Sequence, residues 1–160
     1  MSARIDAAER LIRASPQAIY DAHVDADQLA AWRRPEGMHA RAEHFDPRPG
    51  GRYRMALIYD DPNTAAGKTS ATEDVFEGAF IELDPPHRIV EEIVFESDDP
   101  AFAGRMRLTT TITGKNGGAL VRIEASNVPR GITAADHAVG LASSLANLAA
   151  FVEAPTLPSR

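Results

Sequence analysis

The sequence predicts an α+β fold in which one long C-terminal helix lies across a curved antiparallel sheet of seven strands. Three observations predict this class. Residues 131–153 carry apolar side chains at helical spacing, seven other segments are rich in strand-forming residues, and two short helices fit between the first strand and the second. A helix with so little charge needs apolar partners. Because a straight helix cannot touch a curved sheet along its whole length, we expect a cavity between them, of the kind that binds small ligands.

The predicted C-terminal helix begins after Thr133. Thr133 followed by Asp136 fits a capping box, in which each side chain binds a backbone N–H of the first turn. At helical periodicity, six apolar residues fall on one stripe that faces the sheet, namely Ala134, Ala138, Leu141, Leu145, Leu148 and Val152. His137 and Ser144 flank this stripe. The opposite side is weakly polar, with Val139, Ser143, Ala146 and Ala150, and this leaves a homodimer open as one use of the surface.

The N-terminal part predicts one strand and two short helices. Imperfect alternation over residues 4–13 is typical of a strand. A serine followed by Pro16 fits an N-cap and a first helical position, where the missing N–H of proline is not needed. Asp25 or Asp27 can cap the second short helix, which is expected to end near Trp32.

Six further strands are expected to follow as a meander, over residues 38–46, 52–59, 75–83, 88–95, 105–113 and 119–128. Segments rich in proline, glycine and asparagine lie between them and supply turn chemistry. The connection over residues 60–72 is long enough to predict a mobile flap. On the strand 52–59, Tyr53, Met55 and Tyr59 share a face that we expect to point inward.

Composition indicates one domain over residues 1–160 and excludes several classes of protein. The length is sufficient for a sizeable core. No apolar run of membrane-spanning length and no signal peptide are apparent, so a soluble, cytoplasmic protein without a membrane span is expected. The absence of cysteine removes disulfides and thiolate chemistry. A net charge of −6 argues against a nucleic-acid partner, which requires a basic surface.

No catalytic or metal-binding motif is present. The five histidines form no HExxH pair, and there is neither a GxSxG segment nor a phosphate-binding loop. No metal and no cofactor are therefore expected. Charged residues on predicted strands, among them Glu91 and Arg107, offer acid and base groups, but solvated sheet positions explain most such residues. The catalytic residues, if the protein is an enzyme, stay unassigned.

The candidate ligand-binding residues are aromatic and apolar side chains together with a few polar ones expected to face the cavity. They are Trp32, Tyr53, Met55, Tyr59, Phe76, Phe80, Arg107, His137, Leu141 and Ser144. Taken singly, each aromatic residue fits the plain hydrophobic core better than a cavity wall, and His137 fits a hydrogen bond near the start of its helix better than a ligand contact. As a group they make an apolar, aromatic binding space plausible.

Five short segments together resemble one known family. Residues 45–54, FDPRPGGRYR, are similar to the hallmark of proteins related to the activator of Hsp90 ATPase. Further similarities lie in the segments ASP and IYDA before Trp32, in DPPHRIV, and in NVPRGI before the final helix. The chain thus resembles the AHSA1-like family of the START-like, or SRPBCC, superfamily over residues 4–153. This resemblance implies the helix-grip fold, also called Bet v 1-like. Many members carry a tryptophan where this chain has Leu141.

The resemblance implies a fold more firmly than an activity, because the superfamily includes lipid carriers, hormone receptors, polyketide cyclases and hydroxylase subunits. We favour binding of a small hydrophobic molecule in the cavity between the curved sheet and the C-terminal helix. One alternative is a cofactor-free enzyme similar to polyketide cyclases and aromatases. A second is an interaction protein associated with chaperones, similar to the Hsp90 ATPase activator.

Overall fold

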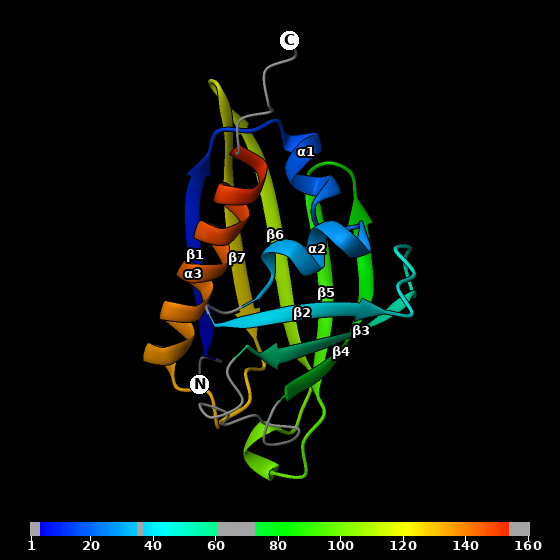
Figure 1. Ribbon diagram of the computed structural model, residues 1–160. Helices are drawn as coiled ribbons and strands as arrows, with labels where there is room; N and C mark the ends of the chain where they lie inside the picture. Colours follow the sequence, from blue (N-terminus) through cyan, green and yellow to red (C-terminus); the bar gives the residue numbers. More distant parts are fainter. Residues whose placement is uncertain (1–3, 35–36, 61–72, 154–160) are drawn as a thin grey trace.

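The computed structural model describes residues 4–34, 37–60 and 73–153 (Figure 1). The first strand and two short helices are followed by six strands and a long helix, in the order predicted from the sequence. The elements are β1 (Ile5–Ile12), α1 (Pro16–Asp21), α2 (Ala26–Trp32), β2 (Met38–Glu43), β3 (Arg52–Tyr59), β4 (Glu73–Asp84), β5 (Arg88–Phe95), a short 3-10 helix (Pro100–Phe102), β6 (Met106–Lys115), β7 (Gly118–Ser126) and α3 (Ala134–Glu153).

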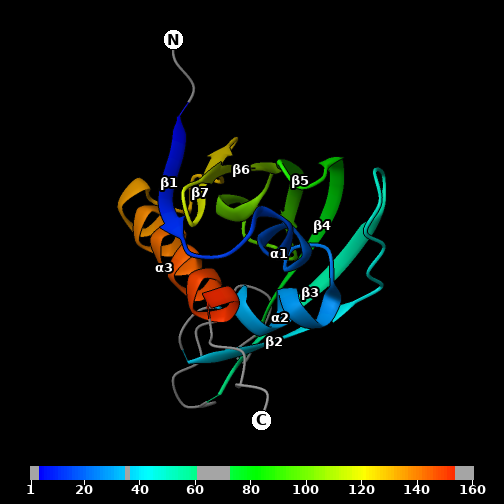
Figure 2. The same cartoon turned by 90° about the horizontal axis from the view of Figure 1, so that it is seen from above.

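The seven strands form one antiparallel sheet in the order β1-β7-β6-β5-β4-β3-β2. Strands β2 to β7 are therefore a meander, and β1 adds to it beside β7. Figure 2 shows that the sheet curls around the three helices, which all lie on its concave side. Helix α3 contacts β1, α1 and α2, whereas α2 contacts β2 and α1 contacts β6. This arrangement confirms the predicted fold class and leaves the space between the sheet and α2 and α3 as the place for a site.

Side-chain caps fix where each helix begins. The side-chain oxygens of Ser15, Asp25 and Thr133 each accept a hydrogen bond from the backbone N–H three residues later, at 3.1, 3.0 and 3.1 Å. Such bonds satisfy backbone donors that the first helical turn leaves unpaired. The three caps were predicted from the sequence, and Asp25 rather than Asp27 caps α2.

The turn between β6 and β7 is the shortest in the sheet. Lys115 pairs with Gly118, so that only Asn116 and Gly117 connect the two strands. Gly117 has a φ of 75°, in the left-handed region that such two-residue turns require and that glycine adopts without steric cost. The glycine-rich segment predicted as a turn therefore sets the register between β6 and β7.

Helix α3 packs against the sheet through its later turns. Leu141, Leu145 and Leu148 are buried, as predicted for the apolar stripe. Ala134 and Ala138 were assigned to the same stripe, but both are exposed, and this part of the prediction was wrong. In the first turns of α3, the contact with β1 is made by the polar side chain of His137, whose Nδ1 lies 2.7 Å from Asp6.

The predicted flap over residues 60–72 lies, apart from Asp60, outside the described residues. Within the described ranges, no helix is both long and apolar enough to cross a membrane.

Candidate ligand cavity

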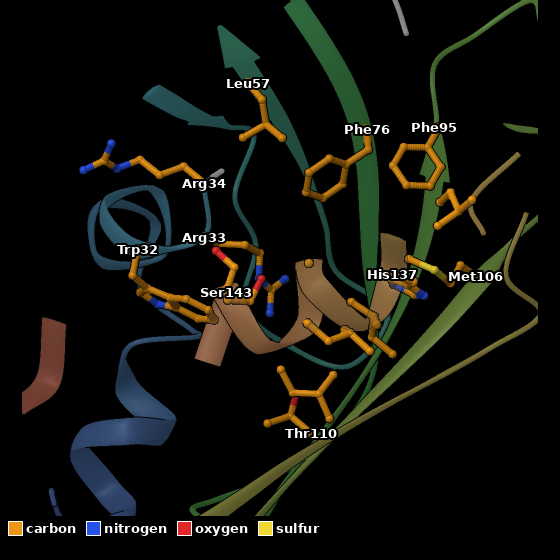
Figure 3. Close-up of a pocket in the computed structure, with 16 residues that line it drawn as sticks. Trp32, Arg33, Arg34, Leu57, Phe76, Phe95, Met106, Thr110, His137 and Ser143 are labelled. Carbon is orange, nitrogen blue, oxygen red and sulfur yellow. The ribbon is translucent and has the colours of Figure 1, made fainter. Parts of the chain in front are cut away.

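A cavity of about 270 Å³ lies between the concave face of the sheet and helices α2 and α3 (Figure 3). Its sheet side is apolar, and five neighbouring strands contribute Leu57, Phe76, Phe95, Met106, Leu108 and Ile123. These side chains face inward because successive residues of a strand point to opposite faces. The wall opposite the helices is therefore a continuous hydrophobic surface.

Strand β6 shows how the alternation divides polar from apolar residues. Met106, Leu108 and Thr110 face the cavity. Arg107 points to the outer face, where its guanidinium is half exposed and lies 3.9 Å from a carboxylate oxygen of Glu92. The prediction that Arg107 lines the cavity is thus corrected, because its position in the strand places it on the solvent side.

Helices α2 and α3 supply the other wall. The indole of Trp32 is buried and donates a hydrogen bond from Nε1 to the backbone oxygen of Ala22 at 2.8 Å, which holds its ring against the cavity. From α3 come His137, Leu141 and Ser144. The two helices thus contribute one fixed aromatic face and a mixture of small and polar groups.

A buried polar network lies behind the cavity at the end of α2. Arg33 donates two hydrogen bonds to the carboxylate of Glu91, at 2.8 and 3.1 Å, and a third to the hydroxyl of Tyr53 at 3.2 Å. Tyr53 in turn donates to Glu91 at 2.5 Å. Glu91 and Tyr53 are each 1% exposed. Arg33 also lines the cavity, so the network fixes a guanidinium at its edge.

The network keeps Glu91 ionised. Burial opposes the charged form, but the nearby guanidinium of Arg33 and the hydroxyl of Tyr53 together hold the pKa of the Glu91 carboxyl below its usual range. Burial opposes the charged form of Arg33 as well, but Glu91 and Tyr53 outweigh it and raise the pKa of Arg33. Burial raises the pKa of the Tyr53 hydroxyl well above its ordinary value. The three groups therefore form a cation, an anion and a neutral hydroxyl, each with a partner.

Gly78 makes room for this network. It is the register partner of Tyr53 on the adjacent strand, and a Cβ atom added there would lie 2.2 Å from Cζ of the Tyr53 ring. The tyrosine therefore lies flat on the backbone of β4, a close approach that only glycine permits.

A second polar cluster ties α3 to β1. Nδ1 of His137 lies 2.7 Å from Oδ2 of Asp6. Asp6 also accepts hydrogen bonds from Nε of Arg4 at 3.0 Å and from Nη2 at 2.7 Å. Hydrogen bonding from Arg4 lowers the pKa of the Asp6 carboxyl more than burial raises it, and His137 lowers it further. His137 lines the cavity, which makes the ordered chain Arg4–Asp6–His137 the second polar feature of the site.

The structure separates the predicted site residues into two groups. Trp32, Phe76, His137, Leu141 and Ser144 lie along the cavity. The others lie elsewhere: Tyr53, Met55 and Phe80 belong to the hydrophobic core, Tyr59 is the last residue of β3, and Arg107 faces outward. Tyr53 and Phe80 are in the core because they pack on each other with ring centroids 5.3 Å apart.

Sequence reasoning missed Arg33 and Asp6 as parts of the site. Arg33 follows the last helical residue of α2, a position typical of solvated cations, and nothing local distinguishes it. Glu91 carried a signal, since it interrupts the apolar run of β5, and a charge buried in such a strand requires a partner. Within the described parts of the chain, no group of three His, Asp or Glu side chains converges as metal ligands would.

These features define a helix-grip protein of the SRPBCC superfamily: a curled antiparallel sheet, a long terminal helix and an apolar cavity between them. The family model described as "Activator of Hsp90 ATPase homolog 1-like protein" matches residues 13–153. The chain belongs to this family, as the sequence resemblance predicted.

Solved structures agree with this assignment. Protein CV1439 from Chromobacterium violaceum is 31% identical, with a TM-score of 0.82 over 95% of this chain and 98% of that one. An AHSA1-like protein from Aeromonas hydrophila is 22% identical, with a TM-score of 0.73 over 94% and 93% of the two chains. DynU16, a protein in the dynemicin biosynthetic locus, shares the fold at 18% identity and a TM-score of 0.66, over 93% of this chain and 47% of that one. Comparison with curated proteins gave no match.

Proposed function

We propose that this protein binds one small, mostly apolar molecule in the cavity between the sheet and helices α2 and α3. The observation that carries the proposal is the cavity itself, a partly open hollow on the concave side of the sheet that the side chains leave unfilled. Here about 270 Å³ stays open beside an otherwise buried core. Its walls are apolar on the sheet side, which favours a hydrophobic occupant.

The volume sets the size of the occupant. An apolar cavity of about 150 Å³ holds one benzene molecule. The cavity of about 270 Å³ is therefore suited to a skeleton of about two fused rings. The alternatives of a cyclase-like enzyme and of a chaperone-associated protein stay predictions, because neither follows from the geometry of the cavity.

Two measurements test this proposal. Native mass spectrometry of the freshly purified protein should show a retained small molecule. After its removal, naphthalene should bind with one-to-one stoichiometry and shift the backbone amide resonances of residues around Leu108 and Leu141. We would abandon the proposal if naphthalene failed to bind.

A matched pair of variants locates the binding. Ser144→Phe places a ring in the cavity and should weaken naphthalene binding at least about tenfold by occupying the space. Ala142→Phe adds the same ring two residues earlier on α3, at an exposed position outside the lining, and should leave the affinity unchanged. Equal affinities for the two variants would place the naphthalene elsewhere.

A further inference from the structure

The imidazole of His137 is held in one orientation by a carboxylate that can only accept hydrogen bonds. Asp6 is 8% exposed and lies between Arg4 and His137. The 2.7 Å contact from His137 Nδ1 to Asp6 therefore requires the ring proton to be on Nδ1. The neutral ring then has its lone pair on Nε2, so that this nitrogen is an acceptor.

Nε2 is left for a ligand. The two ring nitrogens of an imidazole point in nearly opposite directions, so Nε2 faces away from β1 when Nδ1 faces Asp6. The His137 side chain is 12% exposed and lines the cavity near Met106 (Figure 3). Among the described residues, none forms a hydrogen bond with Nε2. A bound molecule that buries this nitrogen without donating a hydrogen bond would leave it unsatisfied, which is unfavourable.

The other charged groups of the cavity already have partners. Arg33 is neutralised by Glu91. Arg34 donates to the backbone oxygens of Ala31 and Met38, and its side chain extends away from the other lining residues (Figure 3). The charge of Arg33 is thus compensated within the protein, and the charge of Arg34 is directed away from the cavity. This balance favours a neutral ligand with a hydrogen-bond donor over a carboxylate.

Aromatic side chains surround the remaining space. Trp32, Phe76 and Phe95 all line the cavity, and the centroids of the two phenylalanine rings lie 6.2 Å apart at an interplanar angle of 62°. Edge-to-face contacts of this kind extend favourably to an aromatic guest. The walls therefore favour a ligand whose apolar skeleton is also aromatic.

We infer that the ligand is a neutral hydroxylated aromatic compound, of the phenol or naphthol class, whose hydroxyl group donates a hydrogen bond to Nε2 of His137. This inference rests on the proposed function, because it names the ligand class of the same cavity. His137 is the ligand-binding residue, and Asp6 is a positioning residue that fixes the ring proton on Nδ1.

Two probes of similar size distinguish the contribution of the hydroxyl donor to affinity from that of the aromatic skeleton. 2-Naphthol carries a hydroxyl donor, whereas 2-methoxynaphthalene keeps the oxygen but cannot donate. The measured quantity is the ratio of their dissociation constants in mildly alkaline buffer, in which free imidazole is neutral. The wild-type protein should prefer 2-naphthol, and His137→Phe should lower this preference about 3- to 10-fold, the effect of one lost hydrogen bond. His87→Phe, at an exposed position outside the cavity, should keep the wild-type ratio.

A second measurement does not depend on any ligand. Long-range proton–nitrogen NMR correlations of the histidine rings report which nitrogen carries the proton, and His137→Gln assigns the relevant signals. The wild-type ring should be protonated on Nδ1, and the Nε2 signal should shift when 2-naphthol binds. Asp6→Asn, whose amide can donate or accept, should populate both tautomers and reduce the preference for 2-naphthol.

The outcomes are distinct from those of the proposed function. If naphthalene fails to bind, the proposed function fails. If naphthalene binds but the preference for 2-naphthol is the same in wild type and His137→Phe, ligand binding stands and the assignment of the hydroxyl to His137 is overturned. A wild-type ring protonated on Nε2 would overturn it as well.

Discussion

Removing Glu91 alone should destabilise the fold far more than removing Glu91 and Arg33 together. In Glu91→Leu, the guanidinium of Arg33, 13% exposed, loses its anion, and the buried hydroxyl of Tyr53 loses its acceptor. Breaking one side of a buried ion pair costs about 3–5 kcal/mol, because the remaining charge stays desolvated. Against a total stability of about 5–15 kcal/mol for a typical protein, this loss is large.

The double variant Arg33→Met/Glu91→Leu removes both charges. Replacement of a whole buried pair by apolar groups of similar size is often close to neutral, and we expect a loss of about 2 kcal/mol or less, mainly from the unpaired Tyr53 hydroxyl. The double variant should therefore be more stable than Glu91→Leu, with a coupling energy of at least about 2 kcal/mol.

Urea denaturation followed by far-UV circular dichroism supplies the four free energies of this cycle. Wild type, the two single variants and the double variant should share one m-value, which shows that the denatured state is comparable. Simple additivity of the two single losses would refute the reasoning, since it would mean that Arg33 and Glu91 do not stabilise each other in the folded state.

Three further predictions concern single positions. Gly78→Ala should cost at least about 2 kcal/mol, since its Cβ would overlap the Tyr53 ring, whereas Gly140→Ala, where nothing lies within 4 Å, should stabilise helix α3 by up to about 1 kcal/mol; equal effects in urea denaturation would contradict the packing. Burial lowers the pKa of His23 to about 4, so the unfolded chain takes up the proton first as the pH falls below about 6.5. The free energy of unfolding should then decrease by about 3 kcal/mol between pH 6.5 and 4, and His23→Gln should lack this contribution; an unchanged pH dependence would refute it. Thr133→Ala removes the N-cap of α3 and should cost about 1 kcal/mol, and an unaltered thermal midpoint would show that the cap contributes nothing.

Signals confined to a few neighbouring residues predicted the structure well. The bounds of β3 were predicted from alternation over residues 52–59, and the start of α3 from the pair Thr133 and Asp136. These features depend on residues that lie close together in the chain, so the local sequence is sufficient to predict them. The end of α3 was predicted equally well, whereas the exposure of Ala138 was not, because it depends on how the helix sits on a distant strand.

Whether a charged strand residue is buried is a tertiary property. Glu91 interrupts an apolar run and is buried, whereas Arg107 follows the alternation of β6 and is half exposed. The burial of Glu91 depends on Arg33, which lies 58 residues from Glu91 in sequence and meets it only after the sheet has curled around α2. No local pattern predicts such a pairing.

Core and cavity are equally difficult to separate from sequence. Phe76 and Phe80 lie on the same face of β4, but Phe76 lines the cavity and Phe80 is enclosed in the core. Both are large aromatic residues that face inward, and their residue type predicts burial in either case. What differs is the distance of the helices from the sheet at each point along the strand, which is set by the packing of α2 and α3.

Trp32 is the only tryptophan of the chain, and its ring forms part of the cavity wall. All fluorescence excited selectively in the indole ring therefore originates at the cavity. The hydrogen bond from Nε1 to the backbone oxygen of Ala22 keeps this ring in place. Intrinsic fluorescence thus reports directly on occupancy, and a collection of unlabelled compounds that absorb outside the indole band can be screened by titration into the unmodified protein.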